Sequence, residues 1–315
     1  MLQATIIMLA VMTAGFLLIE GVASAGVRPV ITTEYLAKNL ADPDLLIIDT
    51  RTEADYGLGH VPGAVNIPYE EWHLHSEEDD CFLVTEEADL VELLRKKGLN
   101  NNSRVVVYDH GKIFSDVTRG GFVYWVLRSR GHENVSYLNG GFSKWTFEGR
   151  MIDNKRPVMK TGDFSAGKTA KARVIGFEQL QEAVEAGDAV LVDCRSSEQH
   201  FGASKRADIS QFGHIPGSLS LPATFFSNAG SDRAPVTIKN KEELSRVVKG
   251  VGLPADKDQE LIVYCNIGQW AGMVCLVLKD ILEYGNVSLY DGSLYEYVWK
   301  SFEPLARYSW GHVQH

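Results

Sequence analysis

Short apolar runs alternate with amphipathic stretches along the chain, most clearly in its second half. Three short runs predict buried strands, at 189–192, 261–264 and 287–289. Between them, apolar residues recur at helical spacing and predict helices over 177–186, 241–250 and 271–284. This alternation is typical of a mostly parallel sheet with helices on both faces. We therefore predict an α/β fold whose ligands bind at the carboxyl ends of the strands.

The second half of the chain repeats the pattern of the first. Four pairs of segments match, namely DTR (49–51) with DCR (193–195), GHVPG (59–63) with GHIPG (213–217), RVVVYDHG (104–111) with LIVYCNIG (261–268), and SYLNGGFSKW (136–145) with SLYDGSLYEY (288–297). A repeated unit of this length is a duplicated domain rather than one turn of a solenoid. We predict two domains of the same fold, 26–152 and 173–315, joined by the polar linker 153–172.

A cysteine stands where one of the predicted strands turns into a helix. Cys265 follows the strand directly, and residues 265–270 lead into the apolar helix. Such a turn leaves backbone N–H groups unpaired and pointing inward, where they bind anions. Because these groups favour a thiolate, Cys265 is the candidate nucleophile, with a structural cysteine as the alternative. The first copy has Asp109 at this position, which indicates a loop start that solvent reaches rather than the core.

Two features near this loop occur in both copies. Asp193 and Arg195 follow a predicted strand, and the first copy keeps the same pattern at 49–51. This pair therefore either organises the catalytic loop or serves the fold. His214 lies in a Gly-His-x-Pro-Gly turn, and the copy without the cysteine keeps the matching histidine, His60. This favours a hydrogen bond that holds the turn over a catalytic base.

The three other cysteines have simpler interpretations. Cys194 matches Thr50 of the first copy, so packing is favoured over chemistry. Cys275 lies on the apolar helix and is expected in the core, while Cys81 follows an acidic run and is expected at the surface. Four cysteines at irregular spacing do not resemble a disulfide framework, and the sequence leaves open whether one pair forms a disulfide.

Charge and motifs exclude several function classes. The net charge of -10 argues against nucleic acids and anionic membrane surfaces as partners. No cluster has metal-ligand spacing, and no phosphate-loop or dinucleotide fingerprint occurs, so we expect neither a metal nor another cofactor. A Cys-x5-Arg phosphatase loop is excluded too, because the position of its arginine holds Ala271, or Gly272 in a loop longer by one residue.

The first residues of the chain form a segment of their own. Residues 4–19 are largely apolar, and Ala23-Ser24-Ala25 fits an A-x-A cleavage site. The pattern predicts a signal peptide over 1–25 and an exported protein, for example in the periplasm, whose mature chain begins at Gly26. The alternative is an uncleaved segment that anchors the protein in a membrane, for which the apolar run is slightly short.

These segments together resemble the two-domain rhodanese family, sulfurtransferases of the thiosulfate or 3-mercaptopyruvate type. The resemblance rests on the DTR and DCR strand ends, the GHVPG and GHIPG turns, the VYCNIGQWAG loop and the LYDGS strand end. It covers nearly everything after residue 28. It implies two tandem rhodanese-like domains, of which the first is inactive, with Asp109 at the cysteine position, and the second carries the nucleophile Cys265.

The resemblance also implies a ping-pong reaction. The Cys265 thiolate takes a sulfane sulfur from thiosulfate or 3-mercaptopyruvate, becomes a persulfide, and passes the sulfur to cyanide or a thiol. The expected partners are therefore a small-molecule donor and acceptor, with a protein thiol as a further partner. The persulfide is expected to lie in a loop made by Asn266, Ile267, Gly268, Gln269, Trp270 and Ala271.

The loop differs from those of the best-known members of the family. Thiosulfate-type loops resemble Cys-Arg-Lys-Gly-Val-Thr, whereas residues 266–267 are uncharged here. A donor-binding arginine beyond the strand end is replaced by Gln199 or His200, which leaves Lys205, Arg206 or a residue of the first copy to take its place. The alternative function is a persulfide carrier or a redox-sensing module without turnover. Sulfur loading by thiosulfate distinguishes transfer chemistry from redox sensing.

Overall fold

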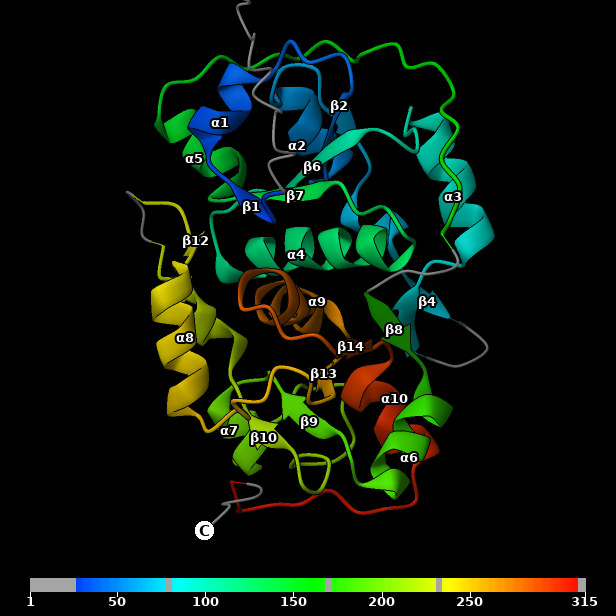
Figure 1. Cartoon of the computed structure of the whole chain (residues 1–315), viewed down its shortest axis with the longest axis vertical. Coiled ribbons are helices and arrows are strands. Elements are labelled where there is room, and N and C mark those ends of the chain that lie inside the picture. The colour runs from blue at the N-terminus through cyan, green and yellow to red at the C-terminus, as the bar shows by residue number, and fades with distance from the viewer. Residues whose placement is uncertain (1–26, 77–80, 168–171, 231–233, 311–315) are drawn as a thin grey trace, which may run out of the picture.

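The computed structural model describes residues 27–76, 81–167, 172–230 and 234–310. The predicted signal peptide lies outside these residues. No helix within the described ranges is long and apolar enough to span a membrane. The chain forms two α/β halves, and Figure 1 shows the first half stacked above the second.

The helices and strands follow one another in the same order in both halves, and the second half adds the π-helical segment η3. The first half contains β1 (Val30–Ile31), α1 (Thr33–Lys38), β2 (Leu45–Asp49), α2 (Glu53–Leu58), β3 (Val65–Asn66), η1 (Tyr69–Glu71), β4 (His73–Ser76), β5 (Cys81–Val84), α3 (Glu87–Lys96), β6 (Arg104–Tyr108), α4 (Phe114–Ser129), β7 (Val135–Leu138) and α5 (Gly141–Phe147). The second half contains β8 (Arg173–Ile175), α6 (Phe177–Ala186), β9 (Val190–Asp193), α7 (Ser197–Phe201), β10 (Leu219–Ser220), η2 (Ala223–Phe226), β11 (Ser227–Asn228), β12 (Thr237–Ile238), α8 (Lys241–Gly250), β13 (Leu261–Tyr264), α9 (Gln269–Cys275), η3 (Leu276–Ile281), β14 (Val287–Tyr290) and α10 (Ser293–Lys300).

Each half is built around a five-stranded sheet whose neighbouring strands run parallel. The strand order is β1-β7-β6-β2-β3 in the first half and β8-β14-β13-β9-β10 in the second. The two sheets therefore repeat one another strand for strand. This architecture confirms the predicted α/β fold with two parallel sheets.

The second half shows how closely the apolar pattern fixes its elements. All four residues of β13 are buried, as expected for a central strand covered on both faces. The helices predicted over 177–186 and 241–250 are α6 and α8. The predicted helix 271–284 differs, because it begins two residues earlier and changes to π-helical hydrogen bonding at η3.

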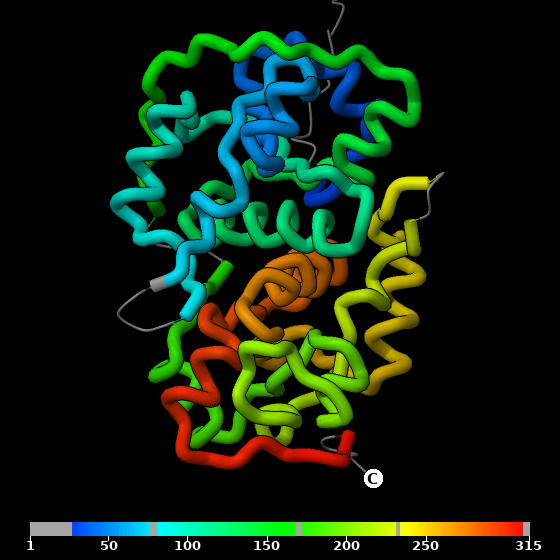
Figure 2. Tube along the Cα trace, turned by 180° about the vertical axis from the view of Figure 1, so that it is seen from behind, coloured from blue at the N-terminus to red at the C-terminus, as the bar shows by residue number. Residues whose placement is uncertain are grey.

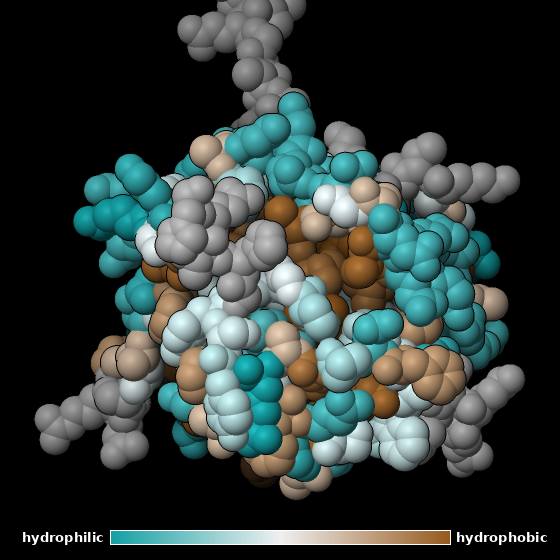
Figure 3. All heavy atoms as spheres, turned by 90° about the horizontal axis from the view of Figure 1, so that it is seen from below, coloured by the Kyte–Doolittle hydropathy of each residue, from teal (hydrophilic) through white to brown (hydrophobic). Residues whose placement is uncertain are grey.

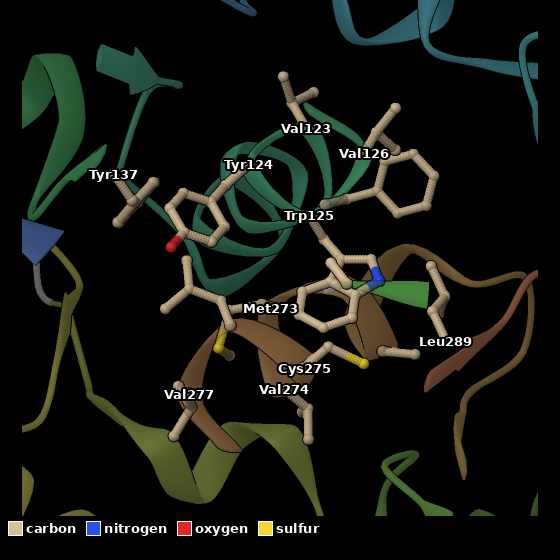
Figure 4. Packing of buried hydrophobic residues seen from close by; sticks show 14 of the residues in the cluster. Val123, Tyr124, Trp125, Val126, Tyr137, Met273, Val274, Cys275, Val277 and Leu289 are labelled. Carbon is tan, nitrogen blue, oxygen red and sulfur yellow. The ribbon is translucent and has the colours of Figure 1, made fainter. Parts of the chain in front are cut away.

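Two helices join the halves. α4 and α9 lie face to face between the two sheets (Figure 1). A Cβ atom on Gly121 of α4 would come within 2.6 Å of Met273, and one on Gly272 of α9 within 2.6 Å of Phe122. The two glycines therefore allow a close helix crossing, around which apolar side chains such as Trp125 interlock in one continuous core (Figure 4).

An extended segment follows the first half. Residues 154–167 contain no helix or strand, and the N–H of Phe164 donates to the Leu99 carbonyl at 3.1 Å. Seen from behind, this part of the chain runs over the first half before it descends to the second (Figure 2). The described part of the predicted linker 153–172 is thus fastened to the first half. The segment after α10 is fastened to the second half in the same way. Ala306 forms an antiparallel bridge with His214, as Asp153 does with His60 in the first half.

Candidate active site

Cys265 lies at the carboxyl end of β13, where the chain turns into α9. Its backbone N–H donates to Ser293 Oγ at 3.2 Å. The turn ends at Gly268, which has a φ of 85° and whose Cβ atom, if it had one, would lie 2.7 Å from the Asp291 carbonyl oxygen. This position therefore requires glycine.

Both copies bury the residue at this strand end. The exposed fraction is 2% for Cys265 and 1% for Asp109, and Cys265 belongs to the apolar core between the sheets. The expectation of a loop start that solvent reaches was therefore wrong. Asp109 tolerates burial because Thr50 Oγ1 and the His110 N–H donate to its carboxylate at 2.7 and 2.6 Å. Burial still raises the pKa of Asp109 to about 6.

The surroundings of Cys265 favour its thiolate. Burial alone raises the pKa of the thiol, but hydrogen bonds from the Cys194 thiol and from the backbone N–H groups of Ala271, Ile267 and Trp270 outweigh it. Together they lower the pKa of Cys265 to about 6. A thiol with this pKa is mostly ionised at neutral pH, which makes its sulfur nucleophilic.

The side chains of the loop fix it to both halves of the molecule. Asn266 Nδ2 donates to Gln199 Oε1 at 3.0 Å, within the second half. Gln269 Nε2 reaches α4 of the first half and donates to Thr118 Oγ1 at 2.8 Å. Trp270 packs edge to face on Phe114, with ring centroids 5.1 Å apart. The loop around Cys265 is therefore completed by the first half.

Asp193 and Arg195 form a buried ion pair on the other face of the sheet. Arg195 Nη2 lies 2.6 Å from Asp193 Oδ2 and donates to the Gly213 carbonyl at 2.7 Å. The first copy makes the same contacts through 49–51. His214 Nδ1 lies 2.8 Å from the His200 carbonyl oxygen, so it also holds the turn. None of these hydrogen bonds reaches Cys265, which favours the role in the fold, but the charge of Cys265 is among the causes that raise the pKa of Arg195.

Three residues of the first half lie on the Cys265 side, and sequence reasoning missed them. Burial is the main cause that raises the pKa of Tyr69, and the charge of Cys265 raises it further. The Tyr69 hydroxyl lies 2.7 Å from His73 Nδ1, and the guanidinium of Arg119 lies 5.9 Å from the centre of the Tyr69 ring. No local sequence signal points to these residues, because only the docking of the halves brings them to the loop.

The three other cysteines are all buried, which differs from the prediction for one of them. Cys275 is buried in the core as expected, but Cys81 is buried as well, at the start of β5, where an exposed side chain was expected. Cys194 packs in the core, yet its thiol also hydrogen-bonds with Cys265, so packing is only part of its environment. Cys194, Cys265 and Cys275 are thiols in this structure.

The surface has a hollow and a cavity besides the Cys265 site. Figure 3 shows an apolar hollow with polar surroundings on the molecule seen from below. A cavity of about 400 Å³ lies in the second half between α6, α10 and the GHIPG turn, and no residue of the Cys265 loop lines it. Among the described residues, no group of three or more His, Cys, Asp or Glu side chains is placed to hold a metal ion.

Comparison with known proteins places this geometry in a family. The rhodanese-like domain matches the chain twice, at residues 32–148 and 177–300. A protein from Saccharopolyspora erythraea named "Putative thiosulfate sulfurtransferase" is 30% identical, over 85% of this chain and 92% of its own length. A Thermus thermophilus protein named "Sulfur carrier protein TtuD" is 28% identical, over 85% of this chain and 92% of its own.

A solved structure shares the whole architecture. The crystal structure of SseA from Escherichia coli, a 3-mercaptopyruvate sulfotransferase with the rhodanese fold, superimposes with a TM-score of 0.71. It is 27% identical in sequence and covers 85% of this chain and 99% of its own. The tandem arrangement of two rhodanese-like domains is thus shared along nearly the full length of that protein.

Proposed function

The chain belongs to the rhodanese-like domain family, and we propose that it is a sulfurtransferase that works through a persulfide on Cys265. The observation that carries this proposal is the buried thiol at the end of β13, which faces three backbone N–H groups and has a pKa of about 6. These groups stabilise negative charge on the thiolate and, after sulfur transfer, on the persulfide. The relatives named as sulfurtransferases support the same reading.

The reaction proceeds in two half-reactions. The Cys265 thiolate attacks the outer sulfur of the donor, the sulfur–sulfur bond of thiosulfate breaks, and sulfite leaves with the bonding electron pair. The enzyme then carries a persulfide whose charge rests in the loop that ends at Gly268. Cyanide or a thiolate attacks the outer sulfur, and the Cys265 thiolate leaves. No metal or cofactor takes part in these steps.

Arg119 is the proposed contact for the anionic donor. The uncharged loop lacks a cation. Lys205 of the second half donates to the Ile209 carbonyl, and Arg206 pairs with Asp208 at 2.8 Å, more closely than Arg119 pairs with Asp116. Arg119 faces the same Tyr69 ring whose pKa responds to Cys265. The Arg119 side chain is 36% exposed. Among the described residues it forms one ion pair, with Asp116 at the long distance of 3.8 Å, which leaves guanidinium N–H groups for a ligand.

A persulfide carrier is the second candidate function. The relative named as a sulfur carrier protein favours it, as does the near-complete burial of Cys265, which limits the acceptors that reach the sulfur. A carrier loads sulfur but releases none to cyanide or to a small thiol. Release to such an acceptor at a steady rate therefore separates an enzyme from a carrier.

Intact-protein mass spectrometry tests the proposal directly. We expect thiosulfate to add about 32 Da, one sulfur atom, to the wild type, and cyanide to remove it. The Cys265→Ser variant should gain no such adduct. A wild type that forms only a mixed disulfide or a sulfenic acid after this treatment would instead support redox sensing.

The location of the protein is a separate proposal. We infer from residues 1–25 that the protein is exported and cleaved after Ala25, so that the mature chain starts at Gly26. The mass of the protein purified from its native cells tests this. A mass that includes residues 1–25 would contradict cleavage.

A further inference from the structure

A second thiol lies beside Cys265. Cys194 follows β9 as Cys265 follows β13, and these strands are neighbours with Asp193 and Tyr264 in register. The Cys194 N–H donates to the Tyr264 carbonyl at 2.9 Å. Neighbouring parallel strands lie about 4.8 Å apart. This separation falls within the Cα–Cα range of about 4.4–6.8 Å that a disulfide spans.

Both sulfur atoms lie on the same face of the sheet. Side chains alternate between the faces of a strand, and Asp193 and Tyr264 point to the face that holds the Arg195 ion pair. Cys194 and Cys265 belong together to the core on the opposite face. The Cys194 sulfur lies 3.1 Å from the Tyr264 carbonyl oxygen, and the Cys194 thiol contributes most among the groups that lower the pKa of Cys265.

The first copy shows that this contact does not require sulfur. Thr50, at the position of Cys194, donates through Oγ1 to Asp109 Oδ2 at 2.7 Å and lies 3.1 Å from the Tyr108 carbonyl oxygen. A hydroxyl therefore fills the same space and is a better hydrogen-bond donor than a thiol. What a thiol adds at this position is the ability to form a bond with sulfur.

We propose that Cys194 is a resolving thiol, which discharges the Cys265 persulfide by forming a Cys194–Cys265 disulfide and releasing hydrosulfide. The Cys194 sulfur attacks the Cys265 sulfur, and the bond between Cys265 and the outer sulfur breaks. The outer sulfur takes the bonding electrons and the proton of Cys194 and leaves as HS⁻. The Cys194 sulfur is oxidised and the outer sulfur is reduced, while the Cys265 sulfur keeps its oxidation state, so the step needs no external oxidant. A small thiol then reopens the disulfide by exchange.

This inference rests on the proposed persulfide of Cys265, and its test uses a loading reagent that does not depend on the donor. The full chain is loaded anaerobically with sodium polysulfide, desalted, and followed by intact mass and by a colorimetric assay for sulfide. In the wild type we expect the adduct of about 32 Da to give way to a species about 2 Da lighter than the reduced protein, with about one equivalent of sulfide. Peptide mapping should locate the disulfide between Cys194 and Cys265.

The matched control is Cys194→Thr, which installs the residue of the first copy. It keeps a hydrogen-bond donor but cannot form the disulfide, so its adduct should persist at least about tenfold longer than that of the wild type. Cys194→Ser serves as a second control if the threonine variant fails to fold. Loss of the adduct at equal rates in wild type and folded control, or release of sulfide without the mapped disulfide, would overturn the proposal. Loading by polysulfide but not by thiosulfate would contradict the thiosulfate assignment alone.

Discussion

The carboxylate of Asp116 accepts a hydrogen bond from the N–H of Ile113 at 3.0 Å. It also accepts one from the N–H of Lys112 at 2.9 Å. The loop that follows Asp109 therefore turns its N–H groups toward a carboxylate of its own helix. In the second copy, α9 has no acidic residue in its first turn, and the N–H groups of the loop face Cys265 instead. The carboxylate of Asp116 thus takes two N–H groups of the first copy's loop, whereas the loop of the second copy faces a single anion, the Cys265 thiolate.

Installing the cysteine in the first copy should not create a second site. In a Cys265→Ser background, Asp109→Cys is expected to gain no persulfide from thiosulfate, because Asp116 already accepts from two N–H groups of this loop and its negative charge disfavours a second anion beside it. Burial and the charge of Asp116 both raise the pKa of a group at this position, and burial is the largest cause, so the new cysteine should also resist alkylation at neutral pH. Intact mass after exposure to thiosulfate measures the outcome. Sulfur loading at the wild-type rate would show that the N–H groups are not what activates Cys265.

The reactivity of Cys265 should follow its pKa of about 6. The thiolate forms as the pH rises through this value, so the rate of alkylation by iodoacetamide should increase from pH 5 to 7 and then level off. An ordinary thiol, with a pKa of about 8.5, would instead still be gaining rate at pH 8. The rate is measured by the mass of the alkylated peptide that contains Cys265. A midpoint above pH 8 would contradict the proposed stabilisation of the thiolate.

Replacing Arg119 should weaken donor binding more than it slows the chemistry. A charged hydrogen bond to an anion is worth about 1.5–3 kcal/mol, so Arg119→Gln should raise KM for thiosulfate by about tenfold or more, with kcat less affected. Arg246→Gln is the matched control, because Arg246 lies on the exposed surface of α8 and, among the described residues, forms one ion pair, with Glu242 at 3.8 Å. Equal effects of the two substitutions on KM would mean that net charge, and not a contact of Arg119, controls binding.

The junction between the halves should depend on Gly272. An alanine there would place its Cβ atom 2.6 Å from Phe122 Cα, so that α4 and α9 must separate. Such overpacking costs about 1–3 kcal/mol of the free energy of unfolding. Urea denaturation of Gly272→Ala measures the loss. The control is Gly250→Ala in α8, where the added Cβ atom meets no atom within 4 Å and little change is expected.

Much of the second half could be read from the apolar pattern. The bounds of β13, α6 and α8 agree with the predicted ranges because each is fixed by local periodicity and by residues that end it. The placement of Cys265 at a strand end followed from the same pattern. The two-copy organisation followed from segments that match along the chain.

The surroundings of Cys265 could not be read in this way. Tyr69, His73 and Arg119 come to the loop through the contact of α4 with α9, which depends on the fit of glycines and large side chains from different halves. The burial of Cys265 has the same origin, since the first half covers the loop. Cys194 lies beside Cys265 because of the register between β9 and β13, and a local sequence pattern does not predict the register between two strands.

The most direct test of the account is thiocyanate production at steady state, measured with thiosulfate and separately with 3-mercaptopyruvate, for the wild type and for Cys265→Ser. If sulfur transfer works through a persulfide on Cys265, the wild type should turn over thiosulfate and the variant should not. The circular dichroism of the variant should match that of the wild type. Turnover that persists in Cys265→Ser would contradict the central role of this residue. A wild type that turns over neither donor would contradict the assignment as an enzyme and leave the persulfide carrier as the function.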